Sequence, residues 1–242
     1  MVIKLLSIAQ NPVAIGGFQH LCPIVITLVF TILFIKYSER NFNALQKQKA
    51  IHCLGWFVSF AIITFHIYRM CTGAYVFKTD LPLYLCSLMA LLIPIFTYYR
   101  RYWMFEILVF WIIGGTLQGV ITPDITDGFL SFDYFRYWIV HLGLLVIIFY
   151  FIFVFKMKPK LSSVFKAFFA LQVYVVLMIV LNNMLDANYF YLNEKPISAS
   201  LLDYFGEWPY YIFVSQLIII PLFLVIYMPF YIAEPNRKSL SK

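Results

Sequence analysis

Charged side chains are scarce in this sequence. Asp, Glu, Lys and Arg together make up 12% of its 242 residues, whereas about a quarter of the residues in a soluble domain are charged. Apolar residues make up 63%, and the mean hydropathy is +0.85. A charge at the centre of a bilayer costs roughly 3 kcal/mol or more, so membrane segments avoid charged residues. This composition excludes an ordinary soluble domain and indicates that lipid surrounds most of the chain.

Several signatures of well-known chemistry are also missing. The sequence contains no Gly-x-Ser-x-Gly turn, no P-loop and no GxGxxG motif, so nothing in it indicates a nucleotide cofactor. Its cysteines show no paired spacing, which excludes a recognisable disulfide framework and the usual zinc patterns. We therefore expect neither a metal ion nor a cofactor. The four cysteines are Cys22, Cys53, Cys71 and Cys86.

Long apolar runs recur along the whole chain. A transmembrane helix needs about 20 consecutive apolar residues, and this length is reached seven times. The sequence therefore predicts one all-α membrane domain over residues 1–242, a bundle of about seven transmembrane helices. The predicted spans lie near residues 20–37, 50–71, 81–98, 102–121, 134–155, 164–185 and 207–232.

Positive charges alternate from one connection to the next. Thirteen of the 18 basic residues lie in or beside the connections after the first, third and fifth spans and in the C-terminal tail. The intervening segments hold only five basic residues but eight of the 11 acidic ones. The positive-inside rule then predicts a cytoplasmic-membrane protein with its N-terminus outside and its C-terminus in the cytoplasm. The net charge of +7 indicates contact with an anionic membrane surface rather than with nucleic acid.

Polar side chains inside the spans gather at one depth, in the outer half of the membrane. Six different helices contribute them, and polar groups that faced lipid would lack hydrogen-bond partners. We therefore expect these side chains to face inward and to form a site. The alternative is that these side chains only form hydrogen bonds between helices, and each such bond contributes about 0.6 kcal/mol to stability. The layer comprises Cys86 and His141 together with His66, Gln118, Asn182, Asn183 and Gln216 as candidate substrate-binding residues.

Cys86 and His141 are residue types that can act in catalysis, as a nucleophile and a base. Pro82 suits the first turn of a helix and Asp80 precedes it, so Cys86 is expected near a helix N-terminus, where the dipole favours a thiolate. An imidazole at a similar depth can accept the thiol proton, as in other activated nucleophiles. The alternative is that both residues only pack in the core, as most buried cysteines do.

Five segments of the sequence carry a family resemblance. They are LPLYLCS at 81–87, GGTLQGVITPD at 114–124, FRYWIVHLGLL at 135–145, NYFYLNEKP at 188–196 and SLLDYFGEWPYY at 200–211. Through these segments the chain is similar, from about residue 50 to about residue 230, to the bacterial YwaF group of membrane proteins and their animal relatives, the transmembrane protein 164 family. The resemblance implies a multi-helix membrane fold and, on the animal side, an acyltransferase that acts on lysophospholipids through a cysteine.

The resemblance implies that the cysteine is Cys86 and that the matching histidine is His141. The chain departs from the family in having Tyr84 where a histidine is common. Two residues correspond to about 200° around a helix, so we expect Tyr84 to point away from the thiol. The loop over residues 186–206 is polar and aromatic, and we expect it to pack over the outer mouth of the bundle as a lid.

These observations predict a membrane-embedded lipid acyltransferase or transacylase. Cys86 forms a thioester with an acyl group, His141 is the general base, and membrane phospholipids or lysophospholipids are the substrates. Two alternatives stay open at this point. The same polar layer suits a transporter or binding protein for an amphiphilic small molecule, and a membrane lipid hydrolase would use water as the acceptor.

Overall fold

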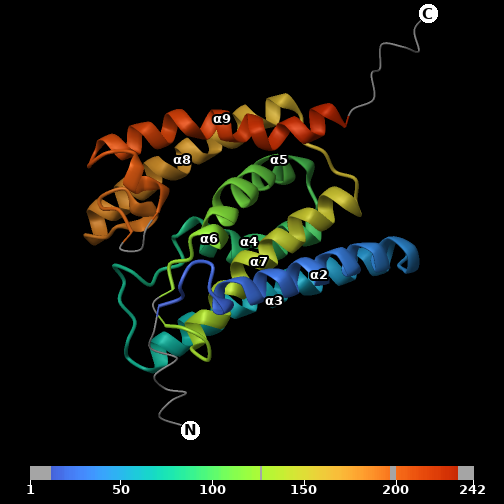
Figure 1. Ribbon diagram of the computed structural model, residues 1–242, viewed down its shortest axis with the longest axis horizontal. Coiled ribbons are helices and arrows are strands. Elements are labelled where there is room, and N and C mark those ends of the chain that lie inside the picture. The colour runs from blue at the N-terminus through green and yellow to red at the C-terminus, as the bar shows by residue number, and fades with distance from the viewer. Residues whose placement is uncertain (1–11, 126, 197–199, 234–242) are drawn as a thin grey trace, which may run out of the picture.

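The computed structural model describes residues 12–125, 127–196 and 200–233, and within these ranges the regular structure is entirely helical (Figure 1). Six of the described helices are long and apolar enough to cross a membrane, and α4 is a shorter apolar helix. The prediction of a seven-helix membrane bundle is thereby confirmed. The helices are α2 (Phe18–Asn41), α3 (Ala44–Cys71), α4 (Leu85–Tyr99), α5 (Tyr102–Trp111) continued by η1 (Ile112–Thr116) and α6 (Leu117–Ile121), α7 (Phe132–Phe153), α8 (Leu161–Leu185) and α9 (Tyr210–Ile232).

The start of α4 differs from the prediction. The helix begins at Leu85, so Pro82 lies in the turn before the helix and not in its first turn. In that turn, Leu81 N donates to Tyr189 Oη at 3.0 Å, and Leu83 O accepts a bond from the Tyr174 hydroxyl. Residues 81–84 are therefore held by side chains from distant parts of the chain, which sequence periodicity does not reveal. As a consequence, Cys86 is the second residue of the helix instead of lying one turn inside it.

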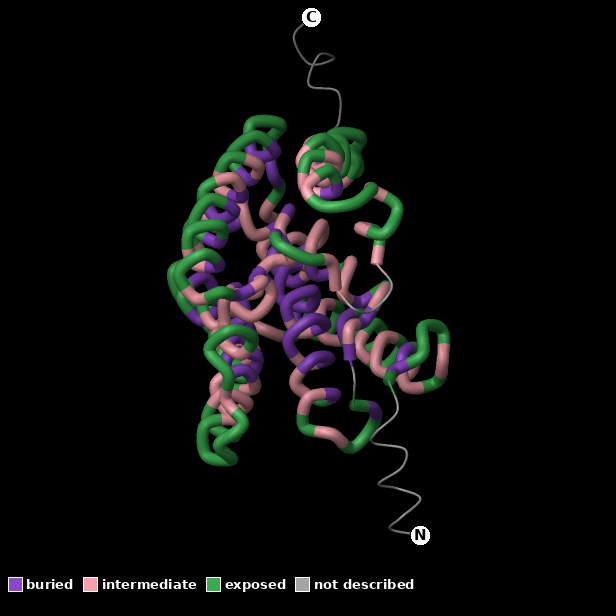
Figure 2. The backbone as a smooth tube through the Cα atoms, turned by 90° about the vertical axis from the view of Figure 1, so that its left-hand side faces the viewer, coloured by how far each residue is buried: buried purple, intermediate pink, exposed green. Residues whose placement is uncertain are grey.

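Helix α7 is the centre of the bundle. It is the most buried of the six long helices, with 67% of its most apolar 18-residue window inside the protein, and Figure 2 shows a buried helix surrounded by the others. Helices α2, α3 and α4 pack against it, and so does the segment formed by η1 and α6. The core therefore lies where α7 meets α3, α4 and α6.

Helices α8 and α9 form a second layer beside α5 (Figure 1). A buried charge joins this layer to the bundle. The carboxylate of Glu106 on α5 is 1% exposed and accepts hydrogen bonds from Ser163 Oγ at 2.7 Å and from Lys166 Nζ at 2.8 Å. Because both partners are donors and one of them is a cation, the charge is compensated at the position where α5 meets α8.

The connections between helices are basic at one end of the bundle and acidic at the other. The connections at 100–101 and 154–160, which contain five basic residues, lie at one end. The connections at 72–84, 122–131 and 186–209 lie at the other end and contain most of the acidic residues. We call the second end the outer end, as the positive-inside rule predicts.

The helix that runs from α5 to α6 contains a π-helical segment. Its wider turns, in which hydrogen bonds join residues five apart, cover Ile112–Thr116, which includes Gly114 and Gly115. Such bulges are rare and occur often at functional sites. A Cβ on Gly114 would lie 3.2 Å from Phe223 Cε1, so the missing side chain permits close packing of α9. The bulge ends at Thr116 and is followed by Gly119, the two residues around which the candidate site forms.

Candidate active site

Cys86 lies at the N-terminus of α4, half-buried at the outer end of the bundle. Its Sγ is 3.6 Å from Thr116 Oγ1, on the last residue of the π-helical segment. Tyr84 is the N-cap residue, so the thiol is close to the first free N–H groups of a 15-residue helix. The positive end of the helix dipole favours a negative charge at this position. The predicted placement of Cys86 at a helix N-terminus is therefore present in the structure.

His141 is buried on the central helix α7, and a hydrogen bond at one ring nitrogen fixes the orientation of its ring. Its Nδ1 lies 2.8 Å from the carbonyl oxygen of Tyr137. A carbonyl oxygen only accepts, so Nδ1 carries the proton and the neutral ring has its lone pair on Nε2. The imidazole also stacks on the Tyr137 ring, with centroids 4.0 Å apart. The geometry therefore prepares Nε2 to accept a proton.

Gly119 brings the His141 ring against the same helix that contacts Cys86. A Cβ on Gly119 would lie 2.9 Å from both Nε2 and Cδ2 of His141. Thr116 and Gly119 are three residues apart and so are neighbours on one helix face. The thiol and the imidazole therefore face one wall, about one helical turn apart. In the structure Sγ is paired with Thr116 and does not form a hydrogen bond with His141.

Tyr137 connects the imidazole to the outer loops. Its hydroxyl donates to Gly119 O at 2.7 Å and accepts from Asp124 N at 3.3 Å. The Asp124 carboxylate in turn accepts from Tyr191 Oη at 3.2 Å. Burial raises the pKa of Tyr191, and the nearby Asp124 carboxylate raises it further. Tyr191 therefore stays a neutral donor to Asp124 at physiological pH.

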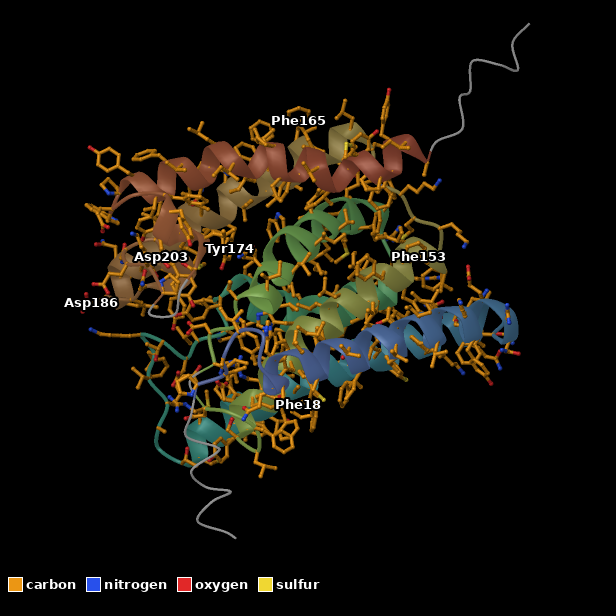
Figure 3. The ribbon with its side chains drawn as sticks, in the orientation of Figure 1. Phe18, Phe153, Phe165, Tyr174, Asp186 and Asp203 are labelled. Carbon is orange, nitrogen blue, oxygen red and sulfur yellow. The ribbon has the colours of Figure 1, made fainter. Side chains whose placement is uncertain are left out.

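The loop at 186–206 packs on the start of α4. The Tyr84 ring, which replaces the common histidine, packs against Tyr189 and Tyr191, with centroid distances of 5.2 and 5.6 Å. Asn182 holds this loop in place: its Nδ2 donates to Tyr189 O at 2.9 Å, and its Oδ1 accepts from Tyr189 N at 2.7 Å. Tyr189 and Tyr191 therefore pack against the start of α4, two residues before Cys86. Figure 3 shows Asp186 at this end of the bundle and Tyr174 directed toward the interior.

The other predicted site residues lie apart from one another and have different hydrogen-bond partners. Gln118 lies on α6 beside Gly119, and its Nε2 is 3.4 Å from Thr122 Oγ1. Asn183 is exposed on the outer face of α8, although its neighbour Asn182 is buried. Gln216 accepts a hydrogen bond from Gln172 at 2.8 Å and so joins α9 to α8.

His66 lies at the outer end of α3, between Phe65 and Tyr75. Both of its ring nitrogens are buried and form no hydrogen bond with the residues that the structure describes. Of the seven residues in the predicted layer, the structure thus brings Cys86 and His141 to one wall, whereas Gln118 bonds to Thr122. It places Asn182 as the anchor of the loop above this wall.

Three residues of the site were not predicted from the sequence: Thr116, Gly119 and Tyr137. Two weak signals for them exist. Tyr137 is four residues before His141, the spacing of neighbours on one helix face. Thr116 and Gly119 are small residues three positions apart in a segment rich in glycine, a composition that permits close helix packing.

No group of three His, Cys, Asp or Glu side chains in the described part of the chain is arranged to hold a metal ion. The TMEM164 family model matches residues 15–227, which is most of the chain. Neither the curated proteins nor the solved structures gave a match.

Proposed function

This chain belongs to the TMEM164 family, and we propose that it is a membrane acyltransferase or transacylase in which Cys86 carries the acyl group. One observation carries the proposal. The thiol at the N-terminus of α4 lies against Thr116, the last residue of η1, and the unprotonated Nε2 edge of His141 lies against Gly119 on α6, three residues later. A nucleophile and a base that share one surface are the minimum that acyl transfer needs.

The first half-reaction acylates the cysteine. His141 Nε2 takes the thiol proton, and the thiolate attacks the ester carbonyl of a phospholipid. The tetrahedral intermediate collapses with cleavage of the C–O ester bond, and the imidazolium returns its proton to the departing lysolipid oxygen. Cys86 is left as an acyl thioester. Because Sγ and Nε2 are not bonded in the resting structure, a side-chain rotation of Cys86 away from Thr116 precedes the proton transfer.

The second half-reaction transfers the acyl group to an acceptor. His141 takes the proton of a lipid hydroxyl, most simply that of a lysophospholipid, and the oxygen attacks the thioester carbonyl. The C–S bond breaks, and the thiolate recovers the proton from the imidazolium. The first N–H groups of α4 are our candidates for stabilising the oxyanion, a contribution of about 3 kcal/mol for one good donor.

The surroundings suit a lipid substrate. The site lies at the outer end of an apolar bundle, and the loop that contains Tyr189 and Tyr191 packs beside it on Tyr84. We therefore place the protein in the cytoplasmic membrane, with its site open to lipids of the outer leaflet. His66 and Asn182 contribute as residues that shape the outer mouth rather than by contact with the reacting carbonyl.

Intact mass spectrometry tests the proposal directly. The purified protein is incubated with a phospholipid mixture, and its mass is measured before and after treatment with hydroxylamine, which cleaves thioesters. We expect a mass increase of one acyl group that hydroxylamine removes and that is absent from Cys86→Ala. Cys53→Ala, which removes an exposed cysteine on α3, is the matched control and should still acquire the adduct.

Product analysis then separates transfer from hydrolysis. A lysophospholipid with a labelled glycerol should become a labelled diacyl lipid if the protein is a transferase. Free fatty acid as the main product would instead identify a hydrolase. If no phospholipid class gives an adduct and no product forms, the covalent mechanism is refuted and a transporter or binding protein becomes the better hypothesis.

A further inference from the structure

The hydroxyl of Thr116 has an unusual partner for a buried threonine in a helix. Thr116 is fully buried, with 0% of its surface exposed. Among the residues that the structure describes, its hydroxyl has one hydrogen-bond partner, the Sγ atom of Cys86 at 3.6 Å. A thiol is a weak donor and a weak acceptor. A buried hydroxyl with such a partner is poorly satisfied, and it gains a charge-assisted hydrogen bond when the thiol becomes a thiolate.

Other threonines in the long helices are bonded differently. Thr31, Thr64 and Thr97 each donate to the carbonyl oxygen four residues earlier in the same helix, at 2.6, 2.8 and 3.1 Å. A threonine inside a helix commonly forms this bond, which uses the hydroxyl proton. Within the described residues, the Thr116 hydroxyl donates to no backbone carbonyl. Its proton is therefore available to the sulfur atom.

The π-helical segment explains the difference. Thr116 is the last residue of this segment, and the carbonyl four residues before it belongs to Ile112. In an α-helix that oxygen would accept from the N–H of Thr116 itself. Here it accepts from the N–H of Leu117, one residue further along the chain. The wider turn thus displaces the Ile112 carbonyl relative to the Thr116 side chain, and the hydroxyl contacts Cys86 instead.

Packing between α4 and η1 holds the hydroxyl and the thiol together. A Cβ on Gly115, the residue before Thr116, would lie 3.5 Å from the side chain of Leu85, the residue before Cys86. Cys86 and Thr116 both lie on helical backbone and not on a loop. The hydroxyl is therefore already directed at the sulfur before the reaction begins. A donor placed in this way stabilises a charge that develops during the reaction, because no further reorganisation is needed.

Two other hydroxyls near the thiol are already used. Tyr137 and Tyr174 lie close enough to the sulfur to interact with it electrostatically. The Tyr137 hydroxyl donates to Gly119 O at 2.7 Å, and the Tyr174 hydroxyl donates to Leu83 O. A hydroxyl has a single proton to donate. Of these three hydroxyls, the one on Thr116 is therefore in a position to donate to the sulfur.

We propose that Thr116 is a further catalytic residue, whose hydroxyl donates a hydrogen bond to Cys86 Sγ whenever the sulfur is negatively charged. The assignment rests on the proposed acyl transfer, in which this charge forms twice: when His141 takes the thiol proton, and when the C–S bond of the thioester breaks. The rotation that brings Sγ to His141 is reversed after the proton transfer, which returns the thiolate to the hydroxyl. Thr116 keeps its proton throughout, because a thiolate only accepts.

The test compares valine and serine at position 116. Valine has the shape of threonine without the hydroxyl, and serine retains the hydroxyl. Thiolate formation is measured without lipid, as the rate at which iodoacetamide alkylates Cys86 in the full-length protein, followed by mass spectrometry of the Cys86 peptide. We expect Thr116→Val to slow this alkylation about tenfold at neutral pH, the usual effect of losing a hydrogen bond to a charged group. Thr116→Ser should retain most of the rate. The difference should narrow as the pH rises, because base then deprotonates the thiol in every variant.

Three controls separate the hydroxyl from a general change in structure. Alkylation of Cys53, an exposed cysteine on α3, is measured in the same digests and should not change. Thr31→Val removes a buried hydroxyl that donates within its own helix, and it should leave alkylation of Cys86 within about twofold of the parent rate. If Thr116→Val does not fold, Thr116→Ala against Thr116→Ser provides the same comparison with a smaller side chain.

The rate of hydroxylamine-sensitive acylation is then measured on the same variants. It should fall in Thr116→Val and recover in Thr116→Ser. Equal losses of alkylation in the two variants, or an unchanged rate in Thr116→Val, would overturn the role of the hydroxyl. Alkylation that depends on the hydroxyl, in a parent protein that acquires no acyl group from any phospholipid, would refute the proposed function alone and support the hydrogen bond to the thiolate.

Discussion

Substitution of Gly119 by alanine tests the geometry of the site most sharply. The new Cβ would lie 2.9 Å from Cδ2 and Nε2 of His141 and 3.2 Å from Tyr137 Oη. Carbon atoms prefer a separation of about 3.5–4.0 Å, so the imidazole must move by at least about half an ångström. It cannot do so freely, because Nδ1 is bonded to Tyr137 O and the two rings are stacked.

The expected effects on stability and on activity differ. Overpacking costs about 1–3 kcal/mol, while replacing a helical glycine by alanine recovers about 1 kcal/mol. The net change in the free energy of unfolding is therefore about 0–2 kcal/mol. A displacement of about 1 Å of a catalytic group can reduce a rate about 100-fold. We expect Gly119→Ala to fold and to acylate Cys86 more slowly by about that factor.

The assay compares two alanine substitutions in one helix. The rate of hydroxylamine-sensitive acylation is followed by intact mass, and the melting temperature in detergent is measured on the same samples. Gly115→Ala is the control, because its Cβ would meet only Leu85 Cδ2, at an ordinary 3.5 Å. The control should acylate at a rate within about twofold of the wild type, as expected of a change that disturbs little.

Two results would refute this reasoning. If Gly119→Ala acylates as fast as the wild type, the position of the His141 ring against α6 is irrelevant to the reaction, and His141 is not the base. If both substitutions slow the reaction equally, the cause is a change in the helix around the π-helical segment and not a collision with the imidazole.

Three further predictions concern the elements that support the site. Asn182→Leu should destabilise the protein by about 2–4 kcal/mol, because both hydrogen bonds to the Tyr189 backbone are lost at a buried position, whereas the exposed Asn183→Leu should change thermal stability little. Lys166→Met should cost about 3 kcal/mol, because the buried Glu106 carboxylate loses its charged partner, and thermal unfolding in detergent measures both effects. Burial raises the pKa of Tyr189 to about 12, so its contribution is complete below the unfolded pKa of about 10 and is lost as the pH rises to about 12; the melting temperature in detergent should fall in that pH window, and Tyr189→Phe should reduce the fall.

The positions of the spans could be predicted from sequence because hydrophobicity alone determines them. Every long apolar run became a helix, and most boundaries differ by only a few residues from the expected ones. The larger differences are at the start of α3, which begins six residues earlier than predicted, and at the start of α4, which begins four residues later. The start of α4 is the more instructive. The start of α4 is set by the hydroxyls of Tyr174 and Tyr189, which bond to the backbone of residues 81–84 from about 100 positions away along the chain.

It was harder to predict which residues form the site. The sequence gives the depth of a residue in the membrane, but it does not give the direction in which the side chain points around the helix. Asn182 and Asn183 have nearly the same depth but are about 100° apart around α8. Asn182 anchors the loop, whereas Asn183 is exposed on the surface of the bundle. Gln216 has a suitable depth as well but pairs with Gln172 between two helices. Cys86 and His141 were identified by their chemistry and by the family resemblance, whereas depth alone did not distinguish them from Gln216.

The contact between the His141 ring and Gly119 could not be found by a search for functional groups. Such a search considers side chains that can react or bind, and Gly119 has none. Its importance arises from the space that a Cβ would fill, which allows the imidazole to approach the α6 backbone while Tyr137 bonds the carbonyl oxygen of the same residue. The imidazole of His141, the proposed base, is thus positioned by a backbone carbonyl, a stacked ring and a missing side chain, three features that require the packed structure. It follows that substitutions at Gly119 and Tyr137 should change the rate of acylation without changing which residue is acylated, whereas only loss of Cys86 should abolish the adduct.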